Sequence, residues 1–392
     1  MKPLQHLTIL DLSRVLACPF ASMILAELGA TVIKVEQPGA GDETRGFEPQ
    51  LARDSAYYFA CNRSKASITV NLRSKEGQDI IRELAQKVDV LVENFPAGTL
   101  GRHGLDFTIL SALNPKLVYV SCTGFGQSGP YAHKKGYDTV FQAMGGLMSL
   151  TGEKDGGPVK PGLPVADLTS GLWVAIGILA MLSGRGQTGR GAHLDFSMLD
   201  GQVSLLTLAA ARYFALGEVP PRLGTEHPGR VPSATFRCRD GKFAHITASD
   251  QHWKPLCKVL GMGEWGSGFV SNAARVEKRN EVMQKLTEKI AAIERAELLR
   301  MLDEVDVPIG PVNDVAEILS DPHVRARGLV GSFDYPGVGE FKALGLPYKF
   351  LGWDNPEIGP PPALGEDTEA ILMERLGYSE DRIADLRAAK AI

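Results

Sequence analysis

Cysteine is scarce in this chain of 392 residues, and the few cysteines present do not form a recognisable framework. Their number is odd, and no two have C-x-x-C spacing, so neither a set of disulfides nor a zinc site is indicated. We expect most of these side chains to be buried thiols. The five cysteines are Cys18, Cys61, Cys122, Cys238 and Cys257.

The chain also has no basic excess and no long apolar run. Its net charge is -4 and its pI is near 6.1, so nothing is available to neutralise a phosphodiester backbone, and nucleic acid is excluded as an expected partner. Asp11 and Ser13 interrupt the N-terminal apolar stretch too early for a signal peptide, and no uninterrupted apolar run reaches membrane-spanning length. We therefore expect no membrane association and a cytoplasmic location.

Several motifs of common enzyme classes are missing. There is no Walker A sequence, no H-E-x-x-H, no G-x-S-x-G and no metal-binding cluster, which disfavours kinase and metallohydrolase chemistry. Residues 184–189 do match G-x-G-x-x-G, but an apolar helix precedes them and a strand follows. A dinucleotide site needs the opposite order, so this match is interpreted as a loop from a helix to a strand, and no metal or redox cofactor is expected.

Short apolar runs alternate with helical patterns through the first half of the chain. This alternation is typical of a parallel sheet covered by helices, and it predicts an α/β fold. Strands are predicted over residues 8–12, 31–35, 67–71, 88–92, 117–122 and 192–197, and helices over 19–28, 75–87, 171–183 and 199–216.

Proline and glycine become frequent near residue 217, which indicates a change of domain. Asp240-Gly241 between two strand patterns predicts a hairpin, and a charged helical stretch follows over residues 274–305. We predict a Rossmann-like large domain with a parallel sheet and a smaller α+β domain. The large domain covers residues 1–205 and is completed by 340–392, the small domain covers 225–330, and residues 206–224 and 331–339 are linkers.

Asp167 is the most informative single residue. It lies between a Pro/Gly turn at residues 161–164 and an apolar run from Leu172 to Leu182. The first turn of a helix offers unpaired N–H groups and partial positive charge, so a carboxylate there is expected to stay ionised and point outward, as a nucleophile must. The alternative is that Asp167 only caps the helix, which is the commonest role of such a residue.

Five segments, in order along nearly the whole chain, closely resemble the class III CoA-transferase family, the CaiB/BaiF type that includes formyl-CoA transferase. The residues of these segments are most similar to those of members that move CoA between dicarboxylic acids such as succinate and glutarate. The segments are Arg14–Pro19, Leu28–Glu36 with Pro38–Arg45, Glu93–Phe95, Gly124–Pro130 followed by Gly136–Asp138, and Asp167 in its Pro/Gly setting.

The resemblance implies a CoA-transferase in which Asp167 is the nucleophile and forms first an anhydride and then an aspartyl-CoA thioester. The donor is expected to be an acyl-CoA such as succinyl-CoA, and the acceptor a free carboxylic acid such as a dicarboxylate. Coenzyme A is a co-substrate, and no other cofactor or metal is implied. The family also forms interlocked homodimers, with the active site at the domain and subunit interface.

The resemblance implies roles for the residues of this chain that stand at the positions of the family's site residues. The implied CoA contacts are Val15, Val70, Asn94, Phe95, Arg102 and Lys135, and the implied substrate pocket contains Tyr137, Leu16, Phe47 and Arg45. Arg102 and Lys135 suit phosphate binding, although without the family both would be interpreted as solvated surface charges. A second carboxylate on the substrate would need a cation, for which Arg45, Arg14 and His227 are the candidates.

Two other functions remain open. An α-methylacyl-CoA racemase of the same fold carries Gly-His-Asp where this chain has Gly136-Tyr137-Asp138, and tyrosine is a poor substitute for a histidine acid-base group. A non-catalytic acyl-CoA-binding protein is the second alternative. One departure from formyl-CoA transferases concerns the loop that closes the site, because residues 245–253 are not glycine-rich here, and Ser249, Gln251 or His252 are candidates to line the acyl pocket instead.

Overall fold

The computed structural model describes all 392 residues, which form two compact units. The first unit comprises residues 1–147, 160–211 and 323–392, and the second comprises residues 148–159 and 212–322. The chain therefore leaves the first unit twice. Residues 148–159, which the sequence-based division kept within the large domain, group with the second unit.

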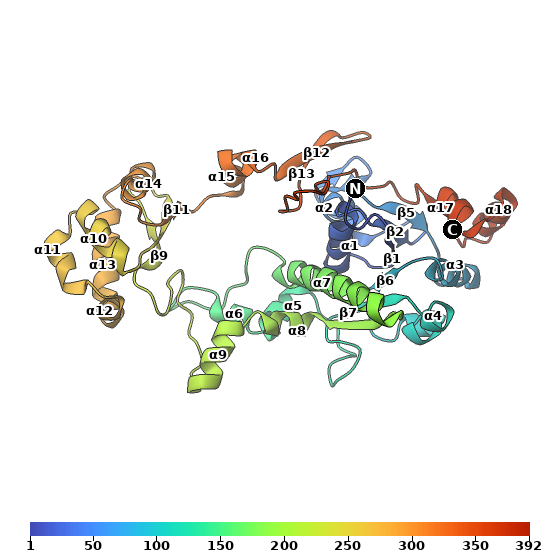
Figure 1. The fold of residues 1–392 in the computed structure, drawn as a ribbon, viewed down its shortest axis with the longest axis horizontal. Helices are drawn as coiled ribbons and strands as arrows, with labels where there is room; N and C mark the ends of the chain where they lie inside the picture. Colours follow the sequence, from blue (N-terminus) through green and yellow to red (C-terminus); the bar gives the residue numbers. More distant parts are fainter. The chain divides into compact units, whose positions relative to one another are not determined.

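A six-stranded parallel sheet forms the centre of the first unit (Figure 1). Its order is β5-β2-β1-β6-β7-β8, and every neighbouring pair is parallel. The chain runs outward from β1 through β2 to β5 and then returns to the other side of β1, which is the strand order of a Rossmann-like fold. The strands are β1 (Thr8–Asp11), β2 (Thr31–Glu36), β5 (Ala66–Thr69), β6 (Val90–Glu93), β7 (Val118–Thr123) and β8 (His193–Ser197).

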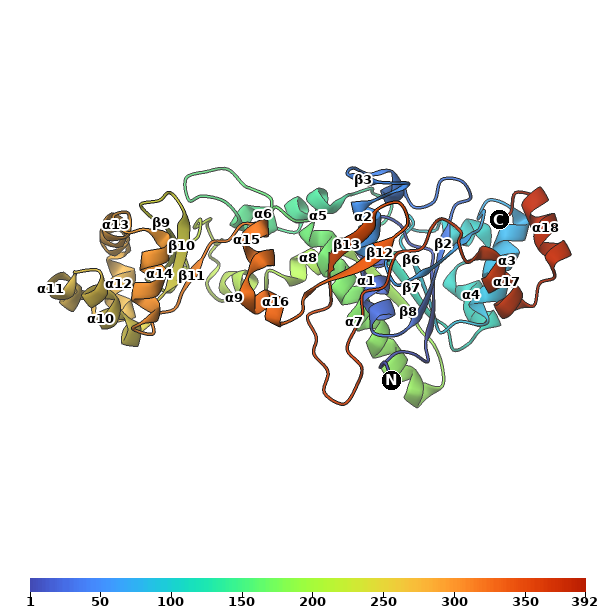
Figure 2. The same ribbon diagram turned by 90° about the horizontal axis from the view of Figure 1, so that it is seen from above.

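Helices cover both faces of this sheet, and successive strand residues therefore enter different cores. Ile9 packs into the core that includes α1 and α7, whereas Leu10 packs into the core on the side of α3 (Figures 1 and 2). The first face carries α1 (Ala17–Glu27), α5 (Asp138–Met144), α7 (Val165–Thr188) and α8 (Met198–Ser204). The second carries α3 (Lys75–Ala85), α4 (Phe107–Leu113), α17 (Thr368–Leu376) and α18 (Glu380–Ala388).

Helix α7 is longer than its sequence pattern predicts. It begins six residues before the predicted range of 171–183 and ends in a glycine-containing turn, with Gly189 in the left-handed conformation at its C-cap. Residues 184–188 of the G-x-G-x-x-G match lie in the last turns of α7 and not in a loop as interpreted from the sequence, although the order of a helix before a strand is as interpreted. Helix α7 is long and apolar enough to span a membrane, but length and composition alone are weak evidence, because the core helix of a soluble protein can have the same length and composition. In this fold α7 packs against α1.

Short elements complete the first unit. A hairpin of β12 and β13 packs on α2 through Tyr58, Phe59, Phe333 and Tyr335, so residues distant in sequence share a small core. These elements are η1 (Glu43–Gly46), β3 (Gln50–Leu51), β4 (Asp54–Ser55), α2 (Ala56–Asn62), η2 (Leu100–His103), β12 (Val330–Tyr335) and β13 (Gly339–Leu344). Helices α6 (Leu147–Leu150), α9 (Thr207–Leu216) and α16 (Pro322–Ala326) lie where the chain passes between the units.

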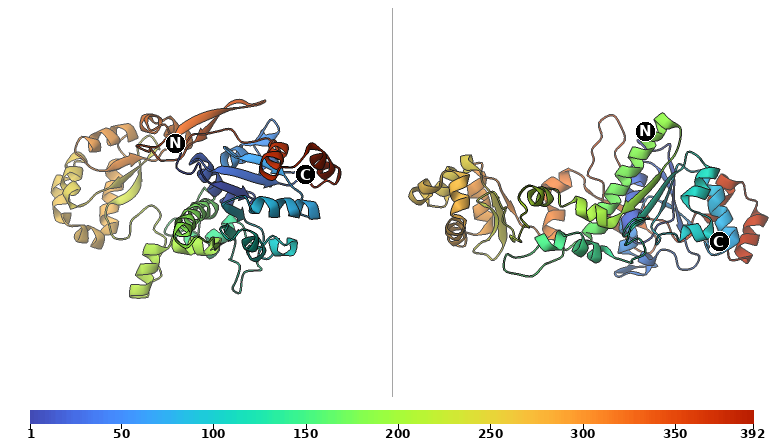
Figure 3. Two further views of the ribbon diagram at one scale, coloured as in Figure 1. Left: turned by 45° about the vertical axis from the view of Figure 1, so that its right-hand side comes forward. Right: turned by 90° about the horizontal axis from the view of Figure 1, so that it is seen from below.

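The second unit is an α+β structure around an antiparallel sheet of order β11-β10-β9 (Figure 3). The predicted hairpin at Asp240-Gly241 is confirmed: it joins β9 to β10, and Gly241 has a φ of +79°. The helices pack on this sheet around Trp253. The elements are β9 (Ser233–Arg237), β10 (Phe243–Thr247), α10 (Asp250–Val259), α11 (Gly263–Gly266), η3 (Ser267–Phe269), α12 (Asn272–Glu277), α13 (Arg279–Ile290), α14 (Arg295–Asp303), β11 (Ile309–Pro311) and α15 (Val315–Ser320).

Candidate active site

Asp167 lies in a cavity of about 330 Å³ within the first unit. The wall is mostly apolar and comes from segments far apart in the sequence: the loop before α1, η1, helices α2 and α5, and the loop that leads into α7. Such a cavity suits an acyl chain, and it leaves few polar groups near the carboxylate. The lining residues are Val15, Leu16, Thr44, Phe47, Tyr57, Cys61, Asp138, Thr139, Lys160, Gly162, Leu163, Pro164 and Asp167.

A neighbouring carboxylate caps the helix that carries Asp167. Asp138 Oδ1 accepts hydrogen bonds from the backbone N–H groups of Ala166 (2.8 Å) and Asp167 (3.2 Å). Gln142, one turn along α5, donates to the other oxygen of Asp138 at 2.5 Å. The free N–H groups of the first turn of α7 are thus used by a residue from α5. Asp167 is the third residue of α7 and not its cap, so the capping role considered for it is wrong.

The expectation that the helix start holds Asp167 as a stable anion is also wrong. Burial, together with the smaller effect of the Asp138 charge, raises the pKa of Asp167 from 3.8 to about 7. Because Asp138 occupies the N–H groups, little positive potential remains for Asp167, and no cation contributes to its pKa. The carboxyl is therefore half-protonated near neutral pH. A carboxyl whose pKa lies near the working pH is a recognised mark of a functional site.

The backbone beside this cavity is strained and firmly held. Val15 has a φ of +68°, which a β-branched residue rarely adopts. Its N–H points to the carboxylate of Asp42 at 3.3 Å, and the Asn94 amide binds both the N–H and the carbonyl of Arg14, at 2.9 and 2.8 Å. Lys34, fully buried, donates to the carbonyl of Ser13 at 2.9 Å. Strain held in place by several bonds is typical of a binding loop.

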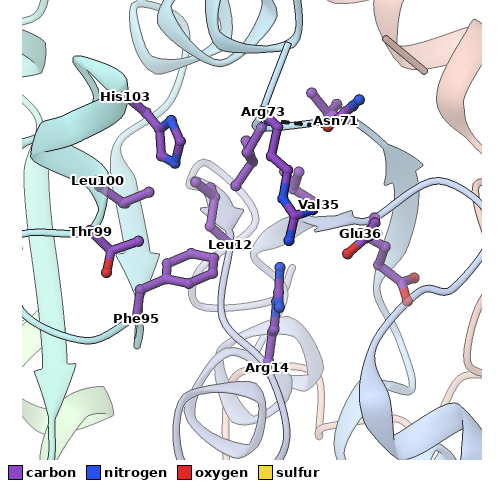
Figure 4. Close-up of a pocket in the computed structure, with 13 residues that line it drawn as sticks. Leu12, Arg14, Val35, Glu36, Asn71, Arg73, Phe95, Thr99, Leu100 and His103 are labelled. Atoms are coloured by element: carbon purple, nitrogen blue, oxygen red, sulfur yellow. Dashed lines mark hydrogen bonds between the residues drawn. The ribbon is translucent and has the colours of Figure 1, made fainter. Parts of the chain in front are cut away.

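A second cavity of about 260 Å³ opens at the carboxyl ends of β1, β2, β5 and β6. Its location agrees with the rule that open α/β sheets bind ligands where the strand order reverses, here beside β1 and β6. The guanidinium groups of Arg14 and Arg73 point toward each other across it (Figure 4). The Arg14 guanidinium lies over the Phe95 ring, 4.9 Å from its centre, and His103 lines the opposite wall. Neither arginine is in an ion pair, so the cavity suits an anion carrying an aromatic group.

The structure brings together part of the predicted site. Leu16, Phe47 and Val15 line the cavity of Asp167. Val70 and Phe95 line the second cavity, and Asn94 supports it by holding the backbone of Arg14.

Other predicted residues lie elsewhere. Arg45, expected in the substrate pocket, is buried and lies outside the cavity lining, because its guanidinium binds Glu36 and Asp54 at 2.6–2.8 Å. Tyr137 is 82% exposed and does not line either cavity, although Asp138 and Thr139 beside it do.

The two predicted phosphate partners are surface residues in this structure. Arg102 is exposed and donates only to Thr99, at 3.3 Å, while its neighbour His103 lines the cavity. Lys135 is exposed and lines neither cavity.

Sequence reasoning missed Arg73, His103 and Asp138 as site residues. Arg73 follows β5 at the carboxyl edge of a predicted parallel sheet, and this position was a usable signal. The sequence held no such signal for His103 and Asp138, because each is brought to its cavity by a turn whose direction cannot be predicted from the sequence.

The polar side chains of the 245–253 segment have structural partners. Ser249 and His252 cap α10 reciprocally, and the Gln251 amide lies 3.0 Å from the His252 ring. Trp253 is buried in the core of the second unit.

No group of three or more His, Cys, Asp and Glu side chains is placed to hold a metal ion. All five cysteines are free and buried. The site presents the Asp167 carboxyl, which has no cationic partner, in a mostly apolar cavity next to a strained loop that continues into a cavity lined by two arginines. These features suit an enzyme that acts on an acyl group attached to a large anionic carrier.

The family follows from comparison with known proteins. Residues 4–368 match the model of CoA-transferase family III, and the chain belongs to this family. It is a CoA-transferase of that class. It is 40% identical to the succinate--glutarate CoA-transferase of Agrobacterium fabrum, with 95% of each chain covered. It is 39% identical to the succinyl-CoA:glutarate CoA-transferase of Mus musculus, with 100% of this chain and 91% of that protein covered.

A solved structure of a protein of this family has the same fold. A crystal structure of a CaiB/BaiF family protein from Brucella suis superposes with a TM-score of 0.86 at 40% identity, covering 95% of this chain and 99% of that one. The α/β architecture predicted from the sequence is confirmed by this match and by the parallel sheet.

Proposed function

We propose that the protein transfers CoA from succinyl-CoA to a free dicarboxylic acid such as glutarate. The observation that carries this proposal is the Asp167 carboxyl, buried without a cationic partner in an apolar cavity, in a member of CoA-transferase family III. Relatives named for succinyl-CoA and glutarate, at 38–40% identity over 95–100% of the chain, support this choice of substrates.

The proposed reaction proceeds on the Asp167 carboxylate. An oxygen of Asp167 attacks the thioester carbonyl, the C–S bond breaks and CoA thiolate leaves, which gives a mixed anhydride. The thiolate then attacks the Asp167 carbonyl, the donor acid leaves as a carboxylate, and an aspartyl-CoA thioester remains. The acceptor carboxylate reverses these steps. An apolar cavity suits them because each intermediate must be kept from water.

The cationic cavity is the proposed site of the nucleotide portion of CoA. Arg14 and Arg73 would bind phosphate groups, and Phe95 offers a ring for the adenine. Val70 and Asn94 remain proposed contacts there. The strained Val15 loop lies between Arg14 of this cavity and Leu16 of the other, so the pantetheine arm would follow that loop toward Asp167. Arg102, Lys135 and Tyr137 stay proposed contacts only if their loops move on binding.

Racemase chemistry is disfavoured by the composition of the cavity. Proton exchange at an α-carbon needs two acid-base groups, and no histidine lines the cavity of Asp167. Cys61 is present, but burial raises the pKa of its thiol to about 11, so it is a poor base at neutral pH.

We further propose a homodimer and a cytoplasmic location. Leu172, Trp173, Ile176 and Leu179 on α7 expose large apolar side chains, and α9 has no buried residue at all. Apolar helices left open to solvent in one chain favour a subunit interface, and the family resemblance favours an interlocked one. Five free, buried cysteines agree with a reducing compartment.

The test is CoA exchange with trapping of the enzyme intermediate. Wild-type protein incubated with succinyl-CoA and then with hydroxylamine should carry a hydroxamate at Asp167, located by mass spectrometry of peptides. Asp167→Asn should bind CoA but show neither exchange nor labelling. Full exchange by Asp167→Asn would refute the proposal, and so would exchange of an α-hydrogen with solvent deuterium in place of CoA transfer.

A further inference from the structure

The cavity that contains Asp167 has one cationic side chain in its lining, Lys160. Lys160 lies in the loop between residues 157 and 164 that leads into α7, and it is exposed. Its ammonium donates at 3.2 Å to the carbonyl of Pro161, and it forms no ion pair with any carboxylate of the chain. An exposed positive charge thus borders the cavity and is not paired with either of the carboxylates that line it, Asp138 and Asp167.

Lys160 does not neutralise the nucleophile. The pKa of Asp167 is raised by burial and by Asp138, and no lysine acts to lower it. Lys160 is exposed and its ammonium is bound to the Pro161 carbonyl, whereas Asp167 is part-buried, so the two groups occupy different parts of the cavity lining. A cation in the same cavity, but separate from the reacting group, is suited to the far end of an acyl chain.

The other cations considered from the sequence lie outside the lining of the Asp167 cavity. Arg45 is buried against Glu36 and Asp54, with its guanidinium 3.7 Å from the centre of the Tyr58 ring. Arg14 lines the second cavity. His227 belongs to the second unit and lines neither cavity. Within the cavity of Asp167, only Lys160 remains to recognise an anion.

We propose that Lys160 selects dicarboxylic acids by binding the distal carboxylate of the acyl or acceptor chain while the proximal carbonyl lies at Asp167. This inference rests on the proposed CoA transfer and names the residue that sets its substrate class. A charge-assisted hydrogen bond from an ammonium to a carboxylate in a mostly apolar cavity is among the stronger polar contacts. Its removal is expected to cost about 10- to 100-fold in kcat/KM.

The experiment compares three acceptors that differ only at the distal end: glutarate, its monoamide glutaramate, and 5-aminopentanoate. With succinyl-CoA fixed as donor, wild-type enzyme should prefer glutarate over glutaramate by about 10- to 100-fold in kcat/KM. Lys160→Met should bring this ratio close to one, because kcat/KM for glutarate falls by about 10- to 100-fold relative to kcat/KM for glutaramate. Lys160→Glu should reverse the order in favour of 5-aminopentanoate, because the charge pair is then inverted.

A matched control lies six residues earlier in the sequence. Lys154 is also exposed but does not line the cavity, and Lys154→Met should keep the wild-type ratio. An unchanged glutarate preference in Lys160→Met would overturn the inference while leaving CoA transfer intact, as would a wild-type enzyme that does not distinguish glutarate from glutaramate. Absence of CoA transfer to any acid by the wild type would instead overturn the proposed function together with the inference.

Discussion

Replacing Asp167 by asparagine should make the protein more stable at alkaline pH, although it removes the proposed nucleophile. The pKa of Asp167 is raised from 3.8 to about 7, chiefly by burial. A pKa change of one unit corresponds to about 1.4 kcal/mol, so the ionised carboxylate lowers the stability of the folded state by about 4 kcal/mol once it is fully charged. Asparagine has nearly the same shape and never carries this charge.

The sign of the pH dependence follows from where the proton is held. The folded protein binds the Asp167 proton more tightly than the unfolded chain does. The contribution of this protonated carboxyl to the free energy of unfolding is therefore fully present below about pH 4 and is lost as the pH rises through about 7. Asp167→Asn should therefore exceed the wild type by about 4 kcal/mol in the free energy of unfolding at pH 8. At pH 4 the difference should be less than about 1 kcal/mol.

The assay is urea denaturation of both proteins at intervals between pH 4 and pH 8, analysed as the difference between them. Burial also raises the pKa of Glu93 to about 7, so Glu93 titrates in the same range, but it is present in both proteins and its contribution cancels. Asp200 provides the control, because it occupies the same third position of a helix, α8, with an exposed side chain. Asp200→Asn should show no comparable rise. A difference between Asp167→Asn and wild type that is independent of pH would refute the reasoning.

Three further predictions concern the support of the site. Asp138→Asn should lower the apparent pKa of the acidic limb of kcat/KM, because a like charge beside Asp167 is removed; an unmoved limb in a pH-rate profile would contradict this. Gly171→Ala should destabilise the fold by about 1–3 kcal/mol, since a Cβ there would lie 2.6 Å from a backbone oxygen of α1. As the control, Gly184→Ala places a Cβ in open space on the same helix, and a thermal melt should show no change or a stabilisation of up to about 1 kcal/mol. Arg45→Ala should cost about 3–5 kcal/mol in the free energy of unfolding, because two buried carboxylates lose their partner. Arg300→Ala breaks only exposed ion pairs and should leave the free energy of unfolding nearly unchanged, and equal losses in chemical denaturation would show that burial does not govern these pairs.

The parallel sheet was largely predictable because its signal is local. Alternation of apolar strands and helical patterns placed the six strands of the sheet within about three residues of their observed bounds. The predicted helix over residues 199–216 is in fact two helices, α8 and α9, separated at Leu205 and Leu206. Both leucines belong to the same apolar stretch, so periodicity gives no sign of the break.

The position of the proposed nucleophile in the fold was predictable, but its electrostatic environment was not. Asp167 stood out because a Pro/Gly turn precedes it and an apolar helix follows. What its carboxyl meets depends on Asp138, which comes from a different helix and takes the N–H groups that the sequence argument had assigned to Asp167. In the same way, Arg45 looked available in the sequence, but Glu36 and Asp54 neutralise it after the chain has folded. Contacts of this kind depend on tertiary structure and have no local sequence pattern.

The unpaired state of Asp167 has a consequence for the resting enzyme. Both proposed covalent adducts of its carboxyl, the anhydride and the thioester, are electrically neutral, whereas the free carboxylate carries a charge that burial and Asp138 oppose. The proposed acylation would therefore relieve an unfavourable interaction of the ionised carboxylate, which only about half of the uncombined molecules carry near neutral pH. In the proposed reaction, the surroundings of Asp167 raise the free energy of its reactive, ionised form relative to the neutral adducts.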